Sequence, residues 1–160
     1  MQNAVTDKVS LVVFDWDGTV MDSIGRIVSS MQAAARHSDL VVPSDFAVKQ
    51  IIGLSLDPAL DVLFPGVTAD KRLQLFTHYR DHYVIHDTTP TPLFDGVEQV
   101  LQQLKAQNVL LAVATGKARK GLQRMFDETG LAKYFDTSRC ADEAHSKPHP
   151  DILQLILLRV

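Results

Sequence analysis

Two short and nearly continuous apolar runs stand out in the pattern of hydrophobic and polar positions: Val9–Phe14 and Val109–Ala114. The first is rich in β-branched residues, and such a run is typical of a strand that is buried on both faces of a parallel sheet. A third, shorter strand is expected within residues 135–140. The first two runs end abruptly in polar residues, at the position where open α/β sheets bind ligands.

Most of the remaining chain shows helical periodicity. Over residues 22–37 the apolar positions recur at the spacing of one helix face, and Asp22 or Ser23 can cap the start. Further helices are expected over residues 45–52, 56–64, 69–86, 95–107 and 151–158, and from just after Lys117 to about Thr129. No strand-like run occurs between Val42 and Thr88.

This order of elements predicts an α/β fold in which a Rossmann-like, three-layer core with a parallel sheet carries an inserted all-helical cap. We assign residues 1–20 and 88–160 to the core and residues 21–87 to the cap. Thr88–Pro92 is stiff and polar, as suits a hinge that leads back to the sheet.

Composition and charge limit the possible classes of protein. The net charge of −3 gives no basic surface for nucleic acid or for an anionic membrane. Cys140 is the single cysteine, so an intramolecular disulfide is excluded. The chain does not begin with a signal-peptide pattern, and its apolar runs are too short to span a bilayer. We therefore expect a cytoplasmic protein without nucleic-acid or membrane partners.

Candidate chemistry begins with Asp15 and Asp17, directly after the first apolar run. One carboxylate can attack phosphorus, while the other protonates the leaving oxygen and later deprotonates water. Gly18 allows the chain to turn sharply there. A simple turn with a capping aspartate is an alternative interpretation. A calcium loop is a second alternative, although Trp16 and Val20 do not supply its ligand pattern.

Two further positions can hold a phosphate. Thr115 ends the second run, and its hydroxyl, together with the N–H groups of Gly116 and Lys117 at the expected helix start, could bind phosphate oxygens. Lys147 lies in a polar loop, where its ammonium group could neutralise charge on a phosphate and on the nucleophile. A capping threonine and a solvated lysine are the simpler interpretations when each residue is taken alone.

Taken together, these segments resemble a known family. Asp15–Asp22 is similar to the first motif of haloacid dehalogenase superfamily phosphatases, Ala112–Lys117 to their second and Ser146–Asp151 to their third. The order and the spacing also agree, with helical sequence between the first two motifs. The similarity covers essentially the whole chain and is greatest to the phosphoglycolate phosphatase-like branch.

The resemblance implies a magnesium-dependent phosphatase that acts through an aspartyl-phosphate on Asp15. Asp15 would be the nucleophile and a ligand of Mg²⁺. Asp17 would be the general acid and base, with its backbone carbonyl on the metal. Family members that are dehalogenases lack this second aspartate, so Asp17 argues against dehalogenation.

The resemblance also assigns the remaining positions. Thr115, Gly116 and Lys147 would hold the transferring phosphoryl group. The cap would close over a small phosphorylated metabolite, with Gly53–Leu56 as its substrate-facing loop. A sugar-phosphate mutase of the same family remains an alternative, as does a catalytically silent fold that serves as a binding or interaction module.

One feature departs from the family pattern. The fourth motif, an acidic pair that completes the magnesium site, does not occur after Lys147. We therefore expect a chain that is truncated before this motif and a weakened magnesium site. With its neighbouring strand missing, Val9–Phe14 would be an apolar edge strand, so self-association through that edge is also expected.

Three histidines, His78, His82 and His86, repeat every four residues on an expected helix. Such spacing can chelate zinc from one helix face. A solvated stripe on the cap is the simpler interpretation, and their role is not assigned by the sequence.

Overall fold

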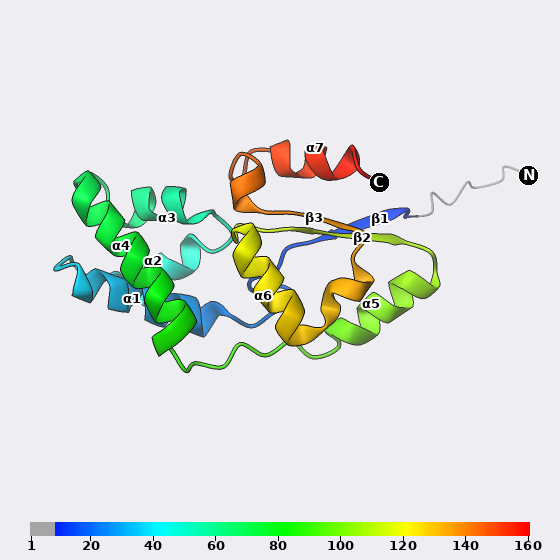
Figure 1. Cartoon of the computed structure of the whole chain (residues 1–160), viewed down its shortest axis with the longest axis horizontal. Helices are drawn as coiled ribbons and strands as arrows, with labels where there is room; N and C mark the ends of the chain where they lie inside the picture. The colour runs from blue at the N-terminus through cyan, green and yellow to red at the C-terminus, as the bar shows by residue number, and fades with distance from the viewer. Residues whose placement is uncertain (1–8) are drawn as a thin grey trace, which may run out of the picture.

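The computed structural model describes residues 9–160 and contains a three-stranded parallel sheet (Figure 1). Strands β1 (Leu11–Phe14), β2 (Leu110–Ala114) and β3 (Thr137–Arg139) lie in the order β1-β2-β3, so β2 is central. All three lie within the predicted runs. The prediction of an α/β fold with a parallel sheet is confirmed.

The helices follow the predicted ranges closely. They are α1 (Ile24–His37), α2 (Asp45–Gln50), α3 (Leu56–Leu63), α4 (Ala69–Asp81), α5 (Val97–Ala106), α6 (Arg119–Thr129) and α7 (Asp151–Leu157). Shorter turns are η1 (His82–His86), η2 (Leu131–Tyr134) and η3 (Ala141–Glu143). The predicted helix over 69–86 is wrong in its last turn, because η1 is a π-helix. Within residues 9–160, no helix is both long enough and apolar enough to cross a membrane.

Strand β2 shows why the core has three layers. Its side chains alternate between the two faces of the sheet. Leu111 and Val113 belong to the apolar cluster formed with helices α5 and α6. Ala112 and Ala114 pack on the other face with Ile152 of α7. Figure 1 shows α7 on one side of the sheet and α5 and α6 on the other.

Helices α1 to α4 and the turn η1 have an apolar core of their own, in which Met31, Leu60 and Leu75 are fully buried. Between Met21 and Leu93 the described chain adds no strand to the sheet. The chain crosses between the two clusters in two adjacent segments, where Asp22 N–H donates to the Pro92 carbonyl at 2.8 Å. An all-helical cap is thus inserted after β1, as predicted.

Strand β1 lies at the edge of the sheet and pairs with β2 alone within residues 9–160. Its four residues are half-buried, and Val9 just before it is 59% exposed. An unpaired strand edge can pair with another chain. Self-association through β1 therefore stays a prediction.

Candidate active site

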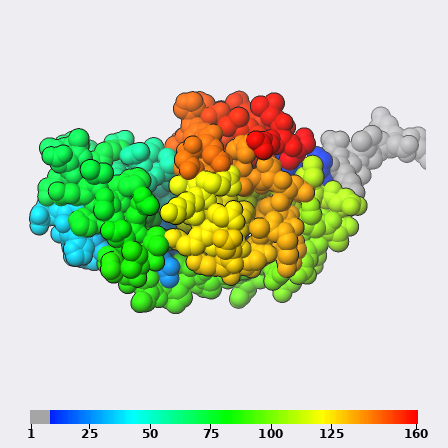
Figure 2. Space-filling model, viewed as in Figure 1, coloured from blue at the N-terminus to red at the C-terminus, as the bar shows by residue number. Residues whose placement is uncertain are grey.

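The carboxyl ends of β1 and β2 place the predicted residues at one edge of the sheet, facing the cap. Asp15 directly follows β1, and Thr115 directly follows β2. Between the cap and this edge lies a cavity of about 640 Å³. In the space-filling view the green helices of the cap lie against the yellow helix α6 (Figure 2). The cavity is lined from the core by Asp15, Asp17, Gly116 and Lys117, and from the cap by Met31, Leu54, Tyr79 and Tyr83, among others.

Asp15 is paired with Lys147, a residue 132 positions further along the chain. The Lys147 Nζ donates to Asp15 Oδ1 at 2.9 Å and to the Ala114 carbonyl at 3.3 Å. The side chains of Lys147 and Asp15 are 26% and 32% exposed. Lys147 is therefore not a solvated surface lysine. It lies where it can neutralise charge on Asp15 and on a phosphate beside it.

Asp17 is held by a different set of groups. The Lys117 Nζ lies 2.9 Å from Asp17 Oδ1, and both side chains are only 12% exposed. The Ser23 hydroxyl donates to the same oxygen at 2.6 Å. Ser23 is the N-cap residue of α1, but its side chain makes no capping hydrogen bond. The predicted cap by Ser23 is therefore wrong, because its hydroxyl is used by Asp17.

The Lys117 side chain joins the core to the cap, and the sequence did not predict this. Its Nζ donates to the Tyr83 hydroxyl at 3.3 Å and lies 4.9 Å from the centre of the Tyr83 ring. Burial alone would lower the pKa of Lys117, but the negative charge of Asp17 and the contact with Tyr83 outweigh burial and raise it. Lys117 is therefore a fixed positive charge between Asp17 and the cap.

Thr115 is 1% exposed and does not cap a helix. Its Oγ1 accepts a hydrogen bond from the Lys117 N–H at 3.1 Å. Helix α6 begins only at Arg119, after Ala118 in an extended conformation. The prediction that the N–H groups of Gly116 and Lys117 lie at a helix start is therefore wrong. The Thr115 hydroxyl satisfies Lys117, and within residues 9–160 the Gly116 N–H donates no hydrogen bond.

Gly116 is also in close contact with the cap loop. A Cβ atom at this position would lie 2.8 Å from the carbonyl oxygen of Gly53 and would also clash with that of Leu54. Close by, Ser55 N–H donates to the Ser146 hydroxyl at 3.1 Å. The predicted substrate-facing loop, Gly53–Leu56, thus lines the cavity and contacts the core at two places.

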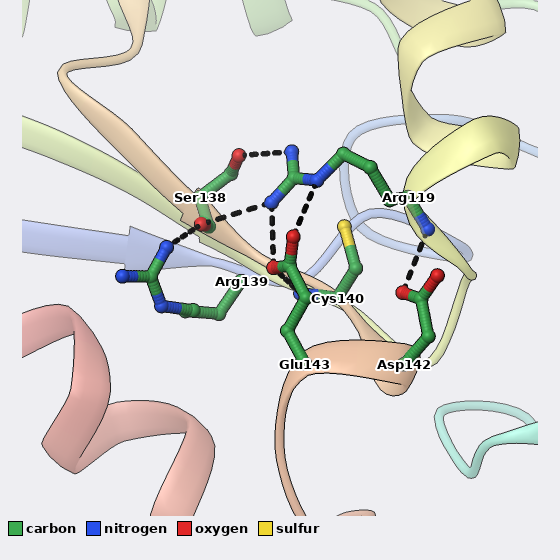
Figure 3. Close-up of polar contacts among 6 residues, drawn as sticks. All are labelled: Arg119, Ser138, Arg139, Cys140, Asp142 and Glu143. Atoms are coloured by element: carbon green, nitrogen blue, oxygen red, sulfur yellow. Dashed lines mark hydrogen bonds and ion pairs between the residues drawn. The ribbon is translucent and has the colours of Figure 1, made fainter.

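Arg119, the first residue of α6, makes polar contacts with β3 and η3 (Figure 3). The Arg119 guanidinium donates to both carboxylate oxygens of Glu143, at 2.8 and 2.7 Å, and to the Ser138 hydroxyl at 2.7 Å. The hydrogen bonds from Arg119 to the Glu143 carboxylate lower the pKa of Glu143. In addition, Ala141 N–H donates to the Lys117 carbonyl at 2.8 Å. The network joins α6, β3 and η3 around the turn that carries Lys117.

The cysteine in this network is not a reactive thiol. Cys140 is fully buried and free. Burial raises its pKa to about 12. A nucleophilic cysteine needs a thiolate at neutral pH. Cys140 is therefore a core residue, and it does not line the cavity.

Oxygen atoms just after β1 are available to a cation. Within residues 9–160, Asp15 Oδ2 and the backbone carbonyl of Asp17 accept no hydrogen bond. Carboxylate and carbonyl oxygens are the ligands that Mg²⁺ accepts, usually with several retained waters. The donor set at the end of β1 therefore fits a magnesium ion.

The histidine stripe of the cap does not form a metal cluster. His82 and His86 have ring centres 5.9 Å apart, and His37 of α1 lies beside His78 at 5.5 Å. Within residues 9–160, the ligand atoms of these histidines do not converge on one point. Chelation of zinc by the helical stripe is therefore not supported.

Comparison with known proteins places the chain in a family. The family model for haloacid dehalogenase-like hydrolases matches residues 12–160. The probable phosphatase IndB of Dickeya dadantii is 33% identical over 156 residues, which cover 94% of this chain and 67% of IndB. The tyrosine-protein kinase PtkA of Mycobacterium tuberculosis is 33% identical over 130 residues, or 81% of this chain and 44% of PtkA.

The fold has close structural neighbours as well. A haloacid dehalogenase-like hydrolase from Bacteroides fragilis superimposes with a TM-score of 0.85 at 24% identity, covering 95% of this chain and 73% of that one. The chain thus spans about two thirds of IndB and less than half of PtkA. Because the family model matches nearly the whole length of the chain, the chain belongs to the haloacid dehalogenase-like hydrolase family.

Proposed function

We propose that this protein is a magnesium-dependent phosphatase that hydrolyses a small organic phosphate through an aspartyl-phosphate on Asp15. The observation that carries the proposal is that both aspartates line one cavity and that each is paired with a lysine at 2.9 Å. The similarity to IndB, which is named a probable phosphatase, supports hydrolysis of a phosphate ester.

In the first step a carboxylate oxygen of Asp15 attacks phosphorus, and the bond from phosphorus to the leaving oxygen breaks. Lys147 offsets the repulsion between the Asp15 carboxylate and the phosphate. Asp17, which must be protonated in the complex with substrate, gives its proton to the leaving oxygen. Asp17 Oδ2 is the atom suited to this transfer, because Oδ1 is taken up by Lys117 and Ser23.

In the second step a water molecule attacks phosphorus in the acyl phosphate. Asp17 takes a proton from this water, and the bond between Asp15 and phosphorus breaks. Inorganic phosphate leaves, and both carboxyl groups return to their starting states. Thr115 and the free N–H of Gly116 are proposed to hold the equatorial phosphate oxygens.

Mg²⁺ is proposed to bind Asp15 Oδ2 and the Asp17 carbonyl, where it would neutralise negative charge on the phosphate. The cap, which we place at residues 21–87, would exclude water while the substrate is held. Its side of the cavity includes the apolar residues Met31 and Leu54 and the aromatic ring of Tyr79. This lining suits a leaving group with an apolar part.

The proposal is tested by hydrolysis of p-nitrophenyl phosphate with and without Mg²⁺. The assay uses the 160-residue chain and, where the natural protein is longer, that protein as well. Turnover should require Mg²⁺ and should be abolished in Asp15→Asn, which is nearly isosteric. Asp95→Asn is the matched control, because Asp95 is exposed and does not line the cavity.

A second measurement identifies the intermediate. Acid quenching during turnover should trap a phosphoryl group on the peptide that contains Asp15, and none should be trapped in Asp15→Asn. Absence of magnesium-dependent turnover in every form of the protein would exclude the proposed activity. Turnover by Asp15→Asn at the normal rate would remove Asp15 from the role of nucleophile.

A further inference from the structure

A group of three metal-ligating side chains flanks Lys147 in the sequence, between residue 145 and the first residue of α7. His145, His149 and Asp151 each offer one ligand atom, and these atoms all lie within 4.8 Å of one another. Within residues 9–160 no other group of three histidine, cysteine or acidic side chains meets this condition. We propose that these three residues bind a divalent transition metal such as Zn²⁺, at a site separate from Asp15 and Asp17.

Two of the ligands are already paired. His145 Nδ1 lies 2.9 Å from Asp151 Oδ2. Two ligands of a tetrahedral zinc ion, each at the usual bond length, are about 3.3 Å apart. The pair must therefore open by only about 0.4 Å. The His145 side chain is 78% exposed and free to move, whereas Asp151 is held by a hydrogen bond from the His145 N–H at 2.9 Å.

His149 supplies the third ligand. Its ring centre lies 4.9 Å from that of His145, and its Nδ1 accepts a hydrogen bond from the Asp151 N–H at 3.2 Å. His149 is exposed, so its ring can turn toward the metal at the cost of this one long hydrogen bond. A water molecule would fill the fourth position, as in zinc sites with three protein ligands.

The residue types set the kind of metal. Imidazole nitrogens favour Zn²⁺, Ni²⁺ and Cu²⁺, whereas Mg²⁺ takes oxygen ligands almost alone. The metal would take the place of the hydrogen between His145 Nδ1 and Asp151 Oδ2, with the N–H proton of the neutral imidazole on Nε2. Lys147 does not compete, because its Nζ is directed toward Asp15.

The site bridges the segment that presents Lys147 to Asp15 and Ser146 to the cap. A bound ion would join the beginning and the end of residues 145–151. Amide hydrogen exchange in residues 145–151 should therefore become slower when the ion binds, and this can be measured without an activity assay.

The experiment is a zinc titration against a chromophoric chelator, with Mg²⁺ in large excess so that the oxygen ligands of the cavity are saturated. The full chain is compared with His145→Gln/His149→Gln and with a matched control, His78→Gln/His86→Gln. We expect the first double variant to bind Zn²⁺ at least about tenfold more weakly, since loss of outer-shell partners alone costs 10–100-fold. The control should bind as the unmodified chain does.

Hydrogen exchange supplies the second readout. Zn²⁺ should slow exchange in residues 145–151 of the unmodified chain and of the control, but not in His145→Gln/His149→Gln. Equal zinc affinity in all three proteins would overturn the proposal, and so would weaker binding in the control alone.

Discussion

Asp15 and Asp17 are one residue apart, and each is 2.9 Å from a lysine nitrogen, yet the two pairs differ in their surroundings. Asp15 and Lys147 are about a third and a quarter exposed and belong entirely to the core. Asp17 and Lys117 are 12% exposed and are covered by the cap through Tyr83. The two ion pairs therefore have the same N–O distance but differ in their exposure to solvent.

The comparison suggests a division of work between the pairs. A partly open pair contributes little to stability but can exchange its lysine contact for contacts with a phosphate. A covered pair costs more to break, because a charge left without its partner is poorly solvated. We infer that Lys147 serves the reaction itself, and that Lys117 holds Asp17 in place when the cap is closed.

The largest expected effect comes from Lys147→Met. Removal of a charge that stabilises the transferring phosphoryl group should lower kcat by about 100- to 1000-fold. Because the Lys147–Asp15 pair is partly exposed, the free energy of unfolding should change by less than about 0.5 kcal/mol. Steady-state kinetics and urea unfolding measure the two quantities.

Lys133→Met provides the control for this substitution. Lys133 is 65% exposed and lies 3.8 Å from Glu98, outside the cavity. It should leave both kcat and stability unchanged. A large loss of stability in Lys147→Met would contradict the division between the two pairs.

A smaller effect on turnover, but a larger one on stability, is expected for Lys117→Met. Asp17 would lose its counter-charge and the contact that fixes its position, so kcat should fall by about 10- to 100-fold. Stability should fall by about 1–3 kcal/mol, because a poorly solvated carboxylate remains. Steady-state kinetics and thermal unfolding test the two parts.

The effect of Lys117→Met on stability should depend on pH, because Lys117 loses its charge at high pH. The pKa of Lys117 is raised above its ordinary value of 10.5 in the folded state. The stability contributed by the Lys117–Asp17 pair is therefore present below pH 10.5 and is lost as the pH rises through the folded-state pKa. The difference in stability between the unmodified chain and Lys117→Met should shrink above that pH. If the difference in stability grows above pH 10.5, the Lys117–Asp17 pair does not stabilise the fold through the charge of Lys117.

The elements of the core could be predicted from the sequence because burial on both faces leaves a direct pattern. All five residues of β2 are apolar, and four are buried. The start of α6 could not be predicted, because the turn before it is held by residues distant in the sequence: Ala141 N–H donates to the Lys117 carbonyl, and Asp142 accepts from Arg119 N–H. The π-helical turn η1 is likewise invisible to a periodicity close to that of an α-helix.

The candidate site shows the same contrast. The motifs at the ends of β1 and β2 indicated where Asp15, Asp17 and Thr115 would lie. The contact between Lys117 and Tyr83 depends on how the cap meets the core, and no local pattern carries that information. The position of Lys117, two residues after Thr115, could have indicated a contact with Asp17, because both residues follow strands whose carboxyl ends meet at one edge of the sheet.

The smallest effect, and the most specific test of the comparison, is expected from Tyr83→Phe. This change removes the hydroxyl that accepts from Lys117 Nζ at 3.3 Å but keeps the ring that lies 4.9 Å from the same atom. A hydrogen bond to a charged group contributes about 1.5–3 kcal/mol, but this one is long at 3.3 Å, so we use the range of ordinary hydrogen bonds, about 0.5–1.5 kcal/mol. We therefore expect kcat/KM to fall by about two- to tenfold and the free energy of unfolding to fall by no more than about 1 kcal/mol. Tyr134→Phe is the control, because its hydroxyl bonds Glu98 at 2.9 Å on the surface of the core. If the two variants have equal kcat/KM, the cap does not act on Asp17 through the Tyr83 hydroxyl. In that case Tyr83→Leu, which also removes the ring, should give the larger loss.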